Sequence, residues 1–145
     1  MSKSTIQLND HLYEYLLNVS LREHEVLKEL RDETLNLSGS QMQISPDQGQ
    51  FMAFMVRAIG AKNILEIGTY TGYSALVCAL AMNNGRLITL DCDPVITKVA
   101  EKYLKKNSSF NEEKDEIEDF EFNQDLEDND NIRSPGWIRY QKRIK

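Results

Sequence analysis

A group of small and polar residues in the middle of the chain is spaced so that it could form a ligand site. Gly68 and Gly72 follow a short apolar run. Ser74 lies just after them, and Asp91 follows a second apolar run. If both runs are parallel strands, these residues meet at the carboxyl ends of the strands, where open α/β sheets bind ligands. The spacing therefore predicts a binding site at that edge of the sheet.

Each residue type suits a different part of one ligand. Gly68 has no side chain, so a ligand could approach the backbone there. Ser74 would offer a hydroxyl beside the free N–H groups of a helix start, which favours a carboxylate. The Asp91 carboxylate could accept hydrogen bonds from two ribose hydroxyls. The set is typical of a site for a nucleoside that also carries a carboxylate.

The spacing of the glycines distinguishes two kinds of nucleotide ligand. The dinucleotide fingerprint is Gly-x-Gly-x-x-Gly, in which the middle glycine lets a pyrophosphate sit close to the backbone. Residues 68–72 read Gly-Thr-Tyr-Thr-Gly and lack that glycine, which favours a methionine-derived nucleoside without phosphate. In the alternative interpretation the glycines only form turns and Asp91 only caps the next element. The acidic residue at the end of the second strand favours the ligand site.

The elements that would position these residues follow from apolar periodicity. Helices are expected at 9–18, 21–36, 46–59, 73–82 and 94–106, and strands at 63–67 and 86–90. The order strand, helix, strand, helix predicts parallel strands joined by a right-handed crossover. The fold class is therefore α/β.

The helix after Ser45 carries several start signals. Ser45 can cap it, Pro46 suits the first helical position and Gln48 completes a capping box. An apolar stripe along this helix is expected to face the core. The stripe consists of Phe51, Met52, Met55, Val56 and Ile59.

Composition narrows the class of protein. The net charge of −6 argues against nucleic-acid and anionic-membrane partners. No apolar run approaches the roughly 20 residues that a membrane span needs, and no signal region opens the chain, so a cytoplasmic location is expected. Cys78 and Cys92 lie in apolar segments and are expected to be buried free thiols. With His11 and His24 they do not form a zinc ligand set, so no metal site is predicted.

The segment 42–94 resembles the caffeoyl-CoA and catechol O-methyltransferase-like family, which are class I S-adenosylmethionine-dependent O-methyltransferases. The resemblance rests on Ser-Pro-Asp-Gln-Gly-Gln-Phe at a helix start, Glu-Ile-Gly-Thr-Tyr-Thr-Gly-Tyr-Ser at the glycine loop, and the aspartate after the second strand. It extends over about residues 8–106. It implies a Rossmann-like methyltransferase fold, of which this chain holds the N-terminal helices and the first β-α-β-α unit, with a sheet truncated relative to the family.

The resemblance also divides the chain into three regions. Residues 1–45 would be an N-terminal helical region, and residues 46–107 a cofactor-binding α/β half-domain. Residues 108–145 form an acidic and then basic tail that departs from the family. Residues 111–145 hold 11 of the 23 acidic residues, a composition typical of disorder. Within the tail, residues 128–131 read Asp-Asn-Asp-Asn but lack a preceding apolar strand, so they predict no metal site.

The resemblance implies S-adenosylmethionine as the cofactor and assigns it six contacts. Ile44 would lie against it from the loop before a helix, Ser74 would bind the amino-acid carboxylate, and Asp91 would hold the ribose hydroxyls. The methionine and ribose side would be lined by Glu66, Gly68 and Thr69.

The implied activity is methyl transfer to a hydroxyl of a small catechol-like or phenolic acceptor, with a homodimer as a further implied partner. The family uses a divalent metal such as Mg²⁺, but its ligand motif does not occur here and no catalytic residue can be named. Two alternatives stay open. The chain could be a catalytically incomplete fragment that acts as a cofactor-binding or dimerisation module, or it could be the remnant of a truncated gene.

Overall fold

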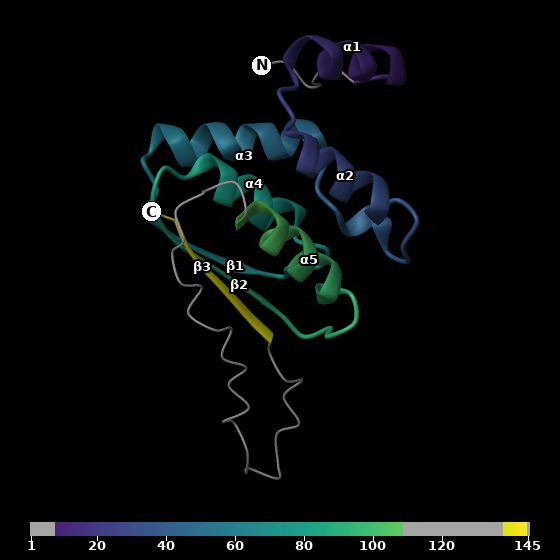
Figure 1. Ribbon diagram of the computed structural model, residues 1–145. Coiled ribbons are helices and arrows are strands. Elements are labelled where there is room, and N and C mark those ends of the chain that lie inside the picture. Colours follow the sequence, from purple (N-terminus) through teal and green to yellow (C-terminus); the bar gives the residue numbers. More distant parts are fainter. Residues whose placement is uncertain (1–7, 109–137, 145) are drawn as a thin grey trace, which may run out of the picture.

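A computed structural model describes residues 8–108 and 138–144 of the chain. The predicted order of strand, helix, strand and helix is confirmed within it (Figure 1). The elements are α1 (Asp10–Ser20), α2 (Glu25–Thr34), a short 3-10 helix η1 (Ser40–Met42), α3 (Pro46–Ala58), β1 (Asn63–Ile67), α4 (Tyr73–Ala81), β2 (Gly85–Asp91), α5 (Thr97–Ser108) and β3 (Ile138–Ile144). None of the helices in these ranges is long and apolar enough to cross a bilayer.

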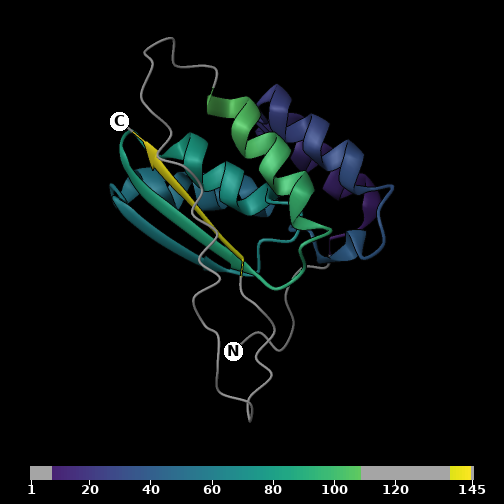
Figure 2. The ribbon, with the colours of Figure 1, turned by 60° about the horizontal axis from the view of Figure 1, so that its bottom comes forward.

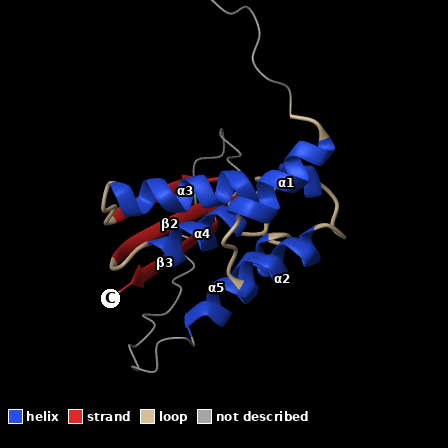
Figure 3. Ribbon diagram, turned by 90° about the horizontal axis from the view of Figure 1, so that it is seen from above, coloured by secondary structure: helices blue, strands red, loops and turns tan. Residues whose placement is uncertain are grey.

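The helices lie on one side of a three-stranded sheet of order β1-β2-β3 (Figures 2 and 3). β1 and β2 are parallel, and Glu66 lies opposite Thr89 in their register. β3 pairs antiparallel with β2, from Gly85 opposite Ile144 to Asp91 opposite Ile138. The carboxyl ends of β1 and β2 therefore meet at one edge, as the sequence predicted.

Strand β3 was not expected from the sequence, which gave residues 108–145 the composition of a loose tail. Residues 138–141 alternate between Ile or Tyr and polar residues, the pattern of a strand with two different faces. The run is short and rich in charge, so the pattern is weak. The rest of the tail, residues 109–137 and 145, lies outside the described residues.

Helix α4 forms the centre of the core because it is apolar on nearly all of its faces. Leu76 is fully buried, and α4 packs against α2, α3, α5 and β2. On α2 the inward side is formed by Val26, Leu27, Leu30 and Thr34, which are all buried. Burying each Leu or Val side chain stabilises the fold by about 1.5–3 kcal/mol.

The predicted apolar stripe of α3 is wrong in large part. Val56 is buried and Met52 packs against the core, but Phe51 is 62% exposed and Ile59 is 70% exposed. The helix rests mainly on α4, with a smaller contact to α1, so only a narrow part of its apolar surface finds a described neighbour. The capping box is also wrong, because the Ser45 side chain makes no capping hydrogen bond.

Two smaller expectations need correction near the end of β2. The last helix begins at Thr97 rather than at Pro94, because the Asp93 carboxylate accepts hydrogen bonds from the backbone N–H groups of Val95 (2.8 Å) and Ile96 (3.1 Å). These bonds form a turn ahead of the helix. Cys78 is a buried free thiol as expected, whereas Cys92 is exposed.

Candidate functional site

A cleft of about 110 Å³ opens where the loop before α3 faces the loop between β1 and α4. The residues that line it are Met42, Gln43, Ile44, Gly68, Thr69, Tyr70, Thr71, Tyr73 and Ser74. Four of the residues predicted for the site therefore lie on its wall, namely Ile44, Gly68, Thr69 and Ser74. Glu66 and Asp91 are not among these lining residues: Glu66 accepts a hydrogen bond from Ser74, and Asp91, at the end of β2, accepts one from the backbone N–H of Tyr70.

The two glycines of the loop, Gly68 and Gly72, serve different structural purposes. Gly68 has φ +98°, and a Cβ added there would meet no atom within 4 Å. Its backbone therefore stays open to a ligand. Gly72 has φ +85°, and a Cβ there would lie 2.8 Å from the Cβ of Ala100. Gly72 thus lets α5 pack closely against the loop, which makes it a packing glycine as well as a turn glycine.

Glu66 organises the side chains beneath the loop. Its Oε1 accepts a hydrogen bond from the Ser74 hydroxyl at 2.5 Å, and its Oε2 accepts one from Thr89 at 2.6 Å. The hydroxyls of Thr89 and Thr69 are 2.7 Å apart. Since Thr89 has a single proton and gives it to Glu66, Thr69 must donate to Thr89. The chain of bonds connects both strands to the start of α4.

Burial is the strongest influence on Glu66 and raises the pKa of its carboxyl above the ordinary value of 4.5. The hydrogen bonds from Ser74 and Thr89 offset part of this rise, and the nearby negative charge of Asp91 adds to it. A carboxyl with a raised pKa takes up a proton more readily, which would lessen repulsion of an anionic group bound next to Ser74.

Asp91 holds the loop by its backbone. Its Oδ2 accepts a hydrogen bond from the N–H of Tyr70 at 2.7 Å, and its Oδ1 accepts from Cys92 at 2.7 Å and Asp93 at 3.0 Å. Desolvation opposes ionisation, but these backbone hydrogen bonds outweigh it and lower the pKa of Asp91. The carboxylate is therefore ionised at neutral pH. It has about four acceptor positions, so it retains some capacity for a ligand hydroxyl.

Several residues of the site were missed by the sequence analysis. Thr71 and Tyr73 line the cleft, and the buried Thr89 connects Glu66 to Thr69. Strand alternation could have found Thr89, because it lies two residues before Asp91 and therefore on the same face of β2. No comparable signal marks Gln43, whose buried Nε2 has no hydrogen-bond partner in the described part of the chain.

Tyr73 connects the cleft to α2. Its hydroxyl donates to Glu23 at 2.7 Å, and Glu23 also accepts from Arg31 at 2.9 and 3.1 Å. Burial and the Glu23 carboxylate raise the pKa of Tyr73, so its phenol stays protonated.

Within residues 8–108 and 138–144, no group of three or more His, Cys, Asp or Glu side chains is placed to hold a metal ion.

Comparison with known proteins shows relatives for most of the chain. The sequence profile of the O-methyltransferase family matches residues 17–133. A caffeoyl-CoA O-methyltransferase of Medicago sativa is 41% identical over 107 residues, which are 72% of this chain and 43% of that protein. The chain thus spans less than half the length of the curated relatives it matches.

Solved structures agree with the sequence comparison. The SAH-bound methyltransferase PaMTH1 of Podospora anserina superposes with a TM-score of 0.67 and 26% identity, over 74% of this chain and 49% of that one. An O-methyltransferase of Bacillus cereus in complex with SAH has a TM-score of 0.59 and 31% identity, over 66% and 44%. The architecture is therefore a Rossmann-like methyltransferase fold, and the chain belongs to the O-methyltransferase family.

Proposed function

We propose that the cleft binds S-adenosylmethionine and that the activity is transfer of its methyl group to a hydroxyl of a small, catechol-like or phenolic acceptor. One observation carries the proposal: Gly68 opens to the cleft at the end of β1, beside the ionised Asp91 at the end of β2. The two SAH-bound neighbours support the choice of nucleoside. The acceptor class is supported by the relative from Medicago sativa, because a caffeoyl group carries phenolic hydroxyls.

The described residues fit the nucleoside in the following way. The first backbone N–H groups of α4 would take the carboxylate, and Ser74 would donate to it when a protonated Glu66 donates to Ser74 in turn. Gly68 and Thr69 would lie along the methionine chain, and Ile44 would supply an apolar contact across the cleft. Asp91 would hold the ribose, and Glu66 would orient Ser74 from behind. When bound, the nucleoside supplies a methyl group that its sulfonium already activates, so the work of the protein is orientation.

The family's metal is not part of this proposal. The described residues offer no ligand set for Mg²⁺, so no step is assigned to it.

We propose a cytoplasmic location, in which thiols such as that of Cys78 stay reduced. Partners would be the small acceptor and a second copy of the chain, with neither nucleic acid nor membrane. The homodimer is supported by exposed apolar residues on α3 and at its C-terminal cap, namely Phe51, Phe54, Met55 and Ile59.

A second candidate is a module that binds the nucleoside without methyl transfer. It is supported by the lining of the cleft, which among the described residues holds no carboxylate, imidazole or amine that could take a proton from an acceptor hydroxyl. The test is an assay of methyl transfer to catechol and to caffeoyl-CoA, with and without Mg²⁺. Product formation supports the enzyme. Binding of the nucleoside without product supports the module, and absence of both contradicts the proposal.

A further inference from the structure

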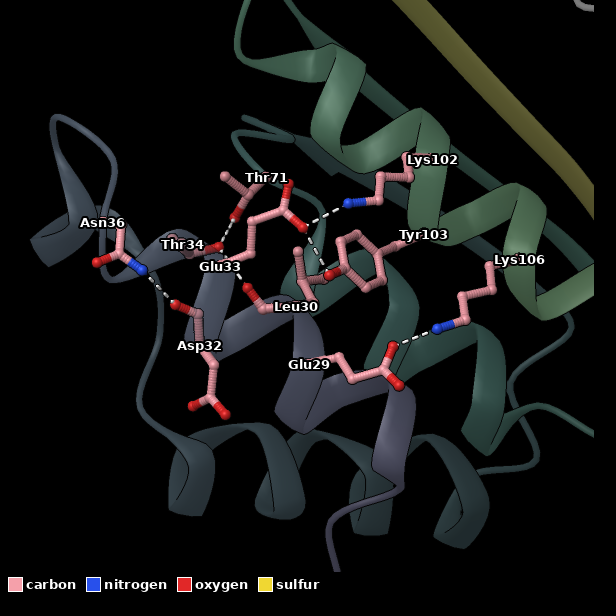
Figure 4. A network of polar contacts seen from close by, with 10 residues as sticks. All are labelled: Glu29, Leu30, Asp32, Glu33, Thr34, Asn36, Thr71, Lys102, Tyr103 and Lys106. Atoms are coloured by element: carbon pink, nitrogen blue, oxygen red, sulfur yellow. Dashed lines mark hydrogen bonds and ion pairs between the residues drawn. The ribbon is translucent and has the colours of Figure 1, made fainter.

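The end of helix α2 makes a buried contact with the glycine loop (Figure 4). Thr34 is the last residue of α2, and Thr71 lies in the loop between Gly68 and Gly72. Their hydroxyl oxygens are 3.0 Å apart, and both residues are fully buried. Neither hydroxyl contacts solvent, so these hydrogen bonds lie in a region of low dielectric constant. Losing one of them would leave a buried polar group unpaired and lower the stability of the fold.

The Thr34 hydroxyl connects its own helix to the loop. It donates to the carbonyl oxygen of Leu30 at 2.8 Å, within the last turn of α2. It also faces the hydroxyl oxygen of Thr71 as a donor at 3.0 Å, so its proton is shared between the helix and the loop. A second bond between these segments runs from the Tyr70 hydroxyl to the carbonyl oxygen of Ser38 at 3.0 Å.

Helix α2 is itself held in place by α5. The Glu33 carboxylate accepts from the buried Tyr103 hydroxyl at 2.7 Å and pairs with Lys102 at 2.6 Å (Figure 4). One turn earlier, Glu29 pairs with Lys106. The lysine pairs are partly exposed and add little, but the bond of Tyr103 is sheltered. The Thr34 hydroxyl thus has a defined position relative to α5, the helix that packs against Gly72.

The loop needs such support because its backbone is strained. Tyr70, a residue with a side chain, has φ +49°, and Gly68 and Gly72 on either side also have positive φ. Residues in this region hold their conformation only when surrounding contacts fix it. On the sheet side, the Asp91 carboxylate accepts a hydrogen bond from the backbone N–H of Tyr70. On the helix side, Thr34 forms a hydrogen bond with Thr71, the residue that follows Tyr70.

We propose that Thr34 is a positioning residue for the ligand loop: its hydroxyl group holds Thr71 by a hydrogen bond and thereby keeps residues 68–72 in the conformation that receives the nucleoside. The inference deepens the proposed function, since it names how the same cleft is kept in shape. Thr34 does not line the cleft, so it acts through Thr71 rather than on the ligand.

The first test compares affinities for S-adenosylhomocysteine by calorimetry. Thr34→Val keeps the shape of the side chain but removes the hydroxyl, and we expect about tenfold weaker binding. Thr34→Ser keeps the oxygen and is expected to bind within about twofold of the wild type. The matched control is Ser20→Ala, because Ser20 also ends a helix and donates to the carbonyl four residues back, at Leu16. It should leave the affinity unchanged.

The second test needs no ligand. Hydrogen exchange of the Tyr70 and Gly72 amides should be about tenfold faster in Thr34→Val than in the wild type, and unchanged in Ser20→Ala. If Thr34→Val does not fold cooperatively, Thr71→Val removes the same bond from the loop side and should show the same acceleration. Combining the two changes should add little to either one, because they break a single bond.

The outcomes separate this inference from the proposed function. Loss of affinity and faster exchange in Thr34→Val, both restored by Thr34→Ser, support the positioning role. Unchanged exchange at Tyr70 and Gly72 overturns it, whatever the affinity. If the wild type binds no nucleoside, the proposed function fails, and the exchange data alone decide whether Thr34 holds the loop.

Discussion

At the scale of single residues, two carboxyl groups close to each other have opposite electrostatic character. Asp91 sits where backbone N–H groups stabilise its charge, so its pKa is lowered despite desolvation. Glu66 is more deeply buried and receives only hydroxyl protons, so its pKa is raised. The contrast suits a site in which Asp91 presents a permanent charge to sugar hydroxyls while Glu66 can carry a proton near a bound carboxylate.

This contrast predicts how stability depends on pH. Because burial raises the pKa of Glu66, the folded state holds that proton more firmly than the unfolded state, and folding is favoured when Glu66 is protonated. Stability from this group is therefore lost as pH rises from the ordinary pKa of 4.5 through the raised value.

We expect Glu66→Gln to be close to the wild type in acid and more stable than it at neutral pH. The measurement is the free energy of unfolding in urea at pH values from about 4 to about 8. Asp91 titrates in both proteins, so its opposite contribution cancels in the difference. A difference that stays constant with pH, or that favours the wild type as pH rises, would contradict the assignment.

At the scale of elements, the close approach of α5 to the glycine loop depends on two small residues. A Cβ at Gly72 would lie 2.8 Å from the Cβ and 3.1 Å from the Cα of Ala100. Gly72→Ala should therefore cost about 3 kcal/mol of stability, partly from the positive φ and partly from the clash. Denaturation by urea measures it.

Two variants separate the contributions. Gly60→Ala has φ +60° and no atom within 4 Å of the new Cβ, so it should lose only the backbone part, about 1 kcal/mol. Adding Ala100→Gly to Gly72→Ala removes the Cβ contact, but the Cα of Ala100 stays close, and the new glycine in α5 costs about 1 kcal/mol by itself. The double variant should therefore be more stable than the sum of the two single changes predicts. Simple additivity would show that the loop and α5 do not meet there.

The elements also show how far the sequence could predict the structure. The unit from β1 to β2 follows from the sequence, because its apolar runs predict the strands and the helix while its glycines predict the loop between them. The face of α3 does not, since the same apolar stripe suits a helix that is covered on one side or on two. Strand β3 does not follow from the sequence either, because its many charged residues weaken the alternation of apolar and polar residues that predicts a strand. In the site, Gly68 and Ser74 carry recognisable signals, whereas Gln43 and Thr71 reach the cleft through the path of the loops.

At the scale of the whole molecule, the described sheet has helices on only one side. Residues of β1 alternate, so Ile64 and Glu66 face α4 while Leu65 and Ile67 face away from it. Leu65 is 64% exposed and Ile67 is 71% exposed. β1 is also the end strand of the described sheet, pairing there with β2 alone. Parallel sheets usually have both faces covered, and an apolar face beside an open edge favours self-association.

We therefore expect Leu65→Thr with Ile67→Thr to raise the concentration at which the chain stays monodisperse, by about threefold or more. Thr keeps the preference for strands, and stability should change by less than about 1 kcal/mol. Light scattering coupled to size exclusion measures the effect. Val95→Thr is the control, because Val95 is at least as exposed, at 74%, but lies in the turn before α5. An equal gain from Val95→Thr would rule out the sheet face as the cause.

The most direct test of the central claim is calorimetric titration of the chain with S-adenosylmethionine, comparing the wild type with Asp91→Asn and Asp93→Asn. Both variants lose one charge and keep a side-chain oxygen, but only Asp91 is proposed to meet the ligand. We predict micromolar binding to the wild type and to Asp93→Asn, and about tenfold or weaker binding to Asp91→Asn. No binding to the wild type, or equal binding to all three proteins, would contradict a nucleoside site at the ends of β1 and β2.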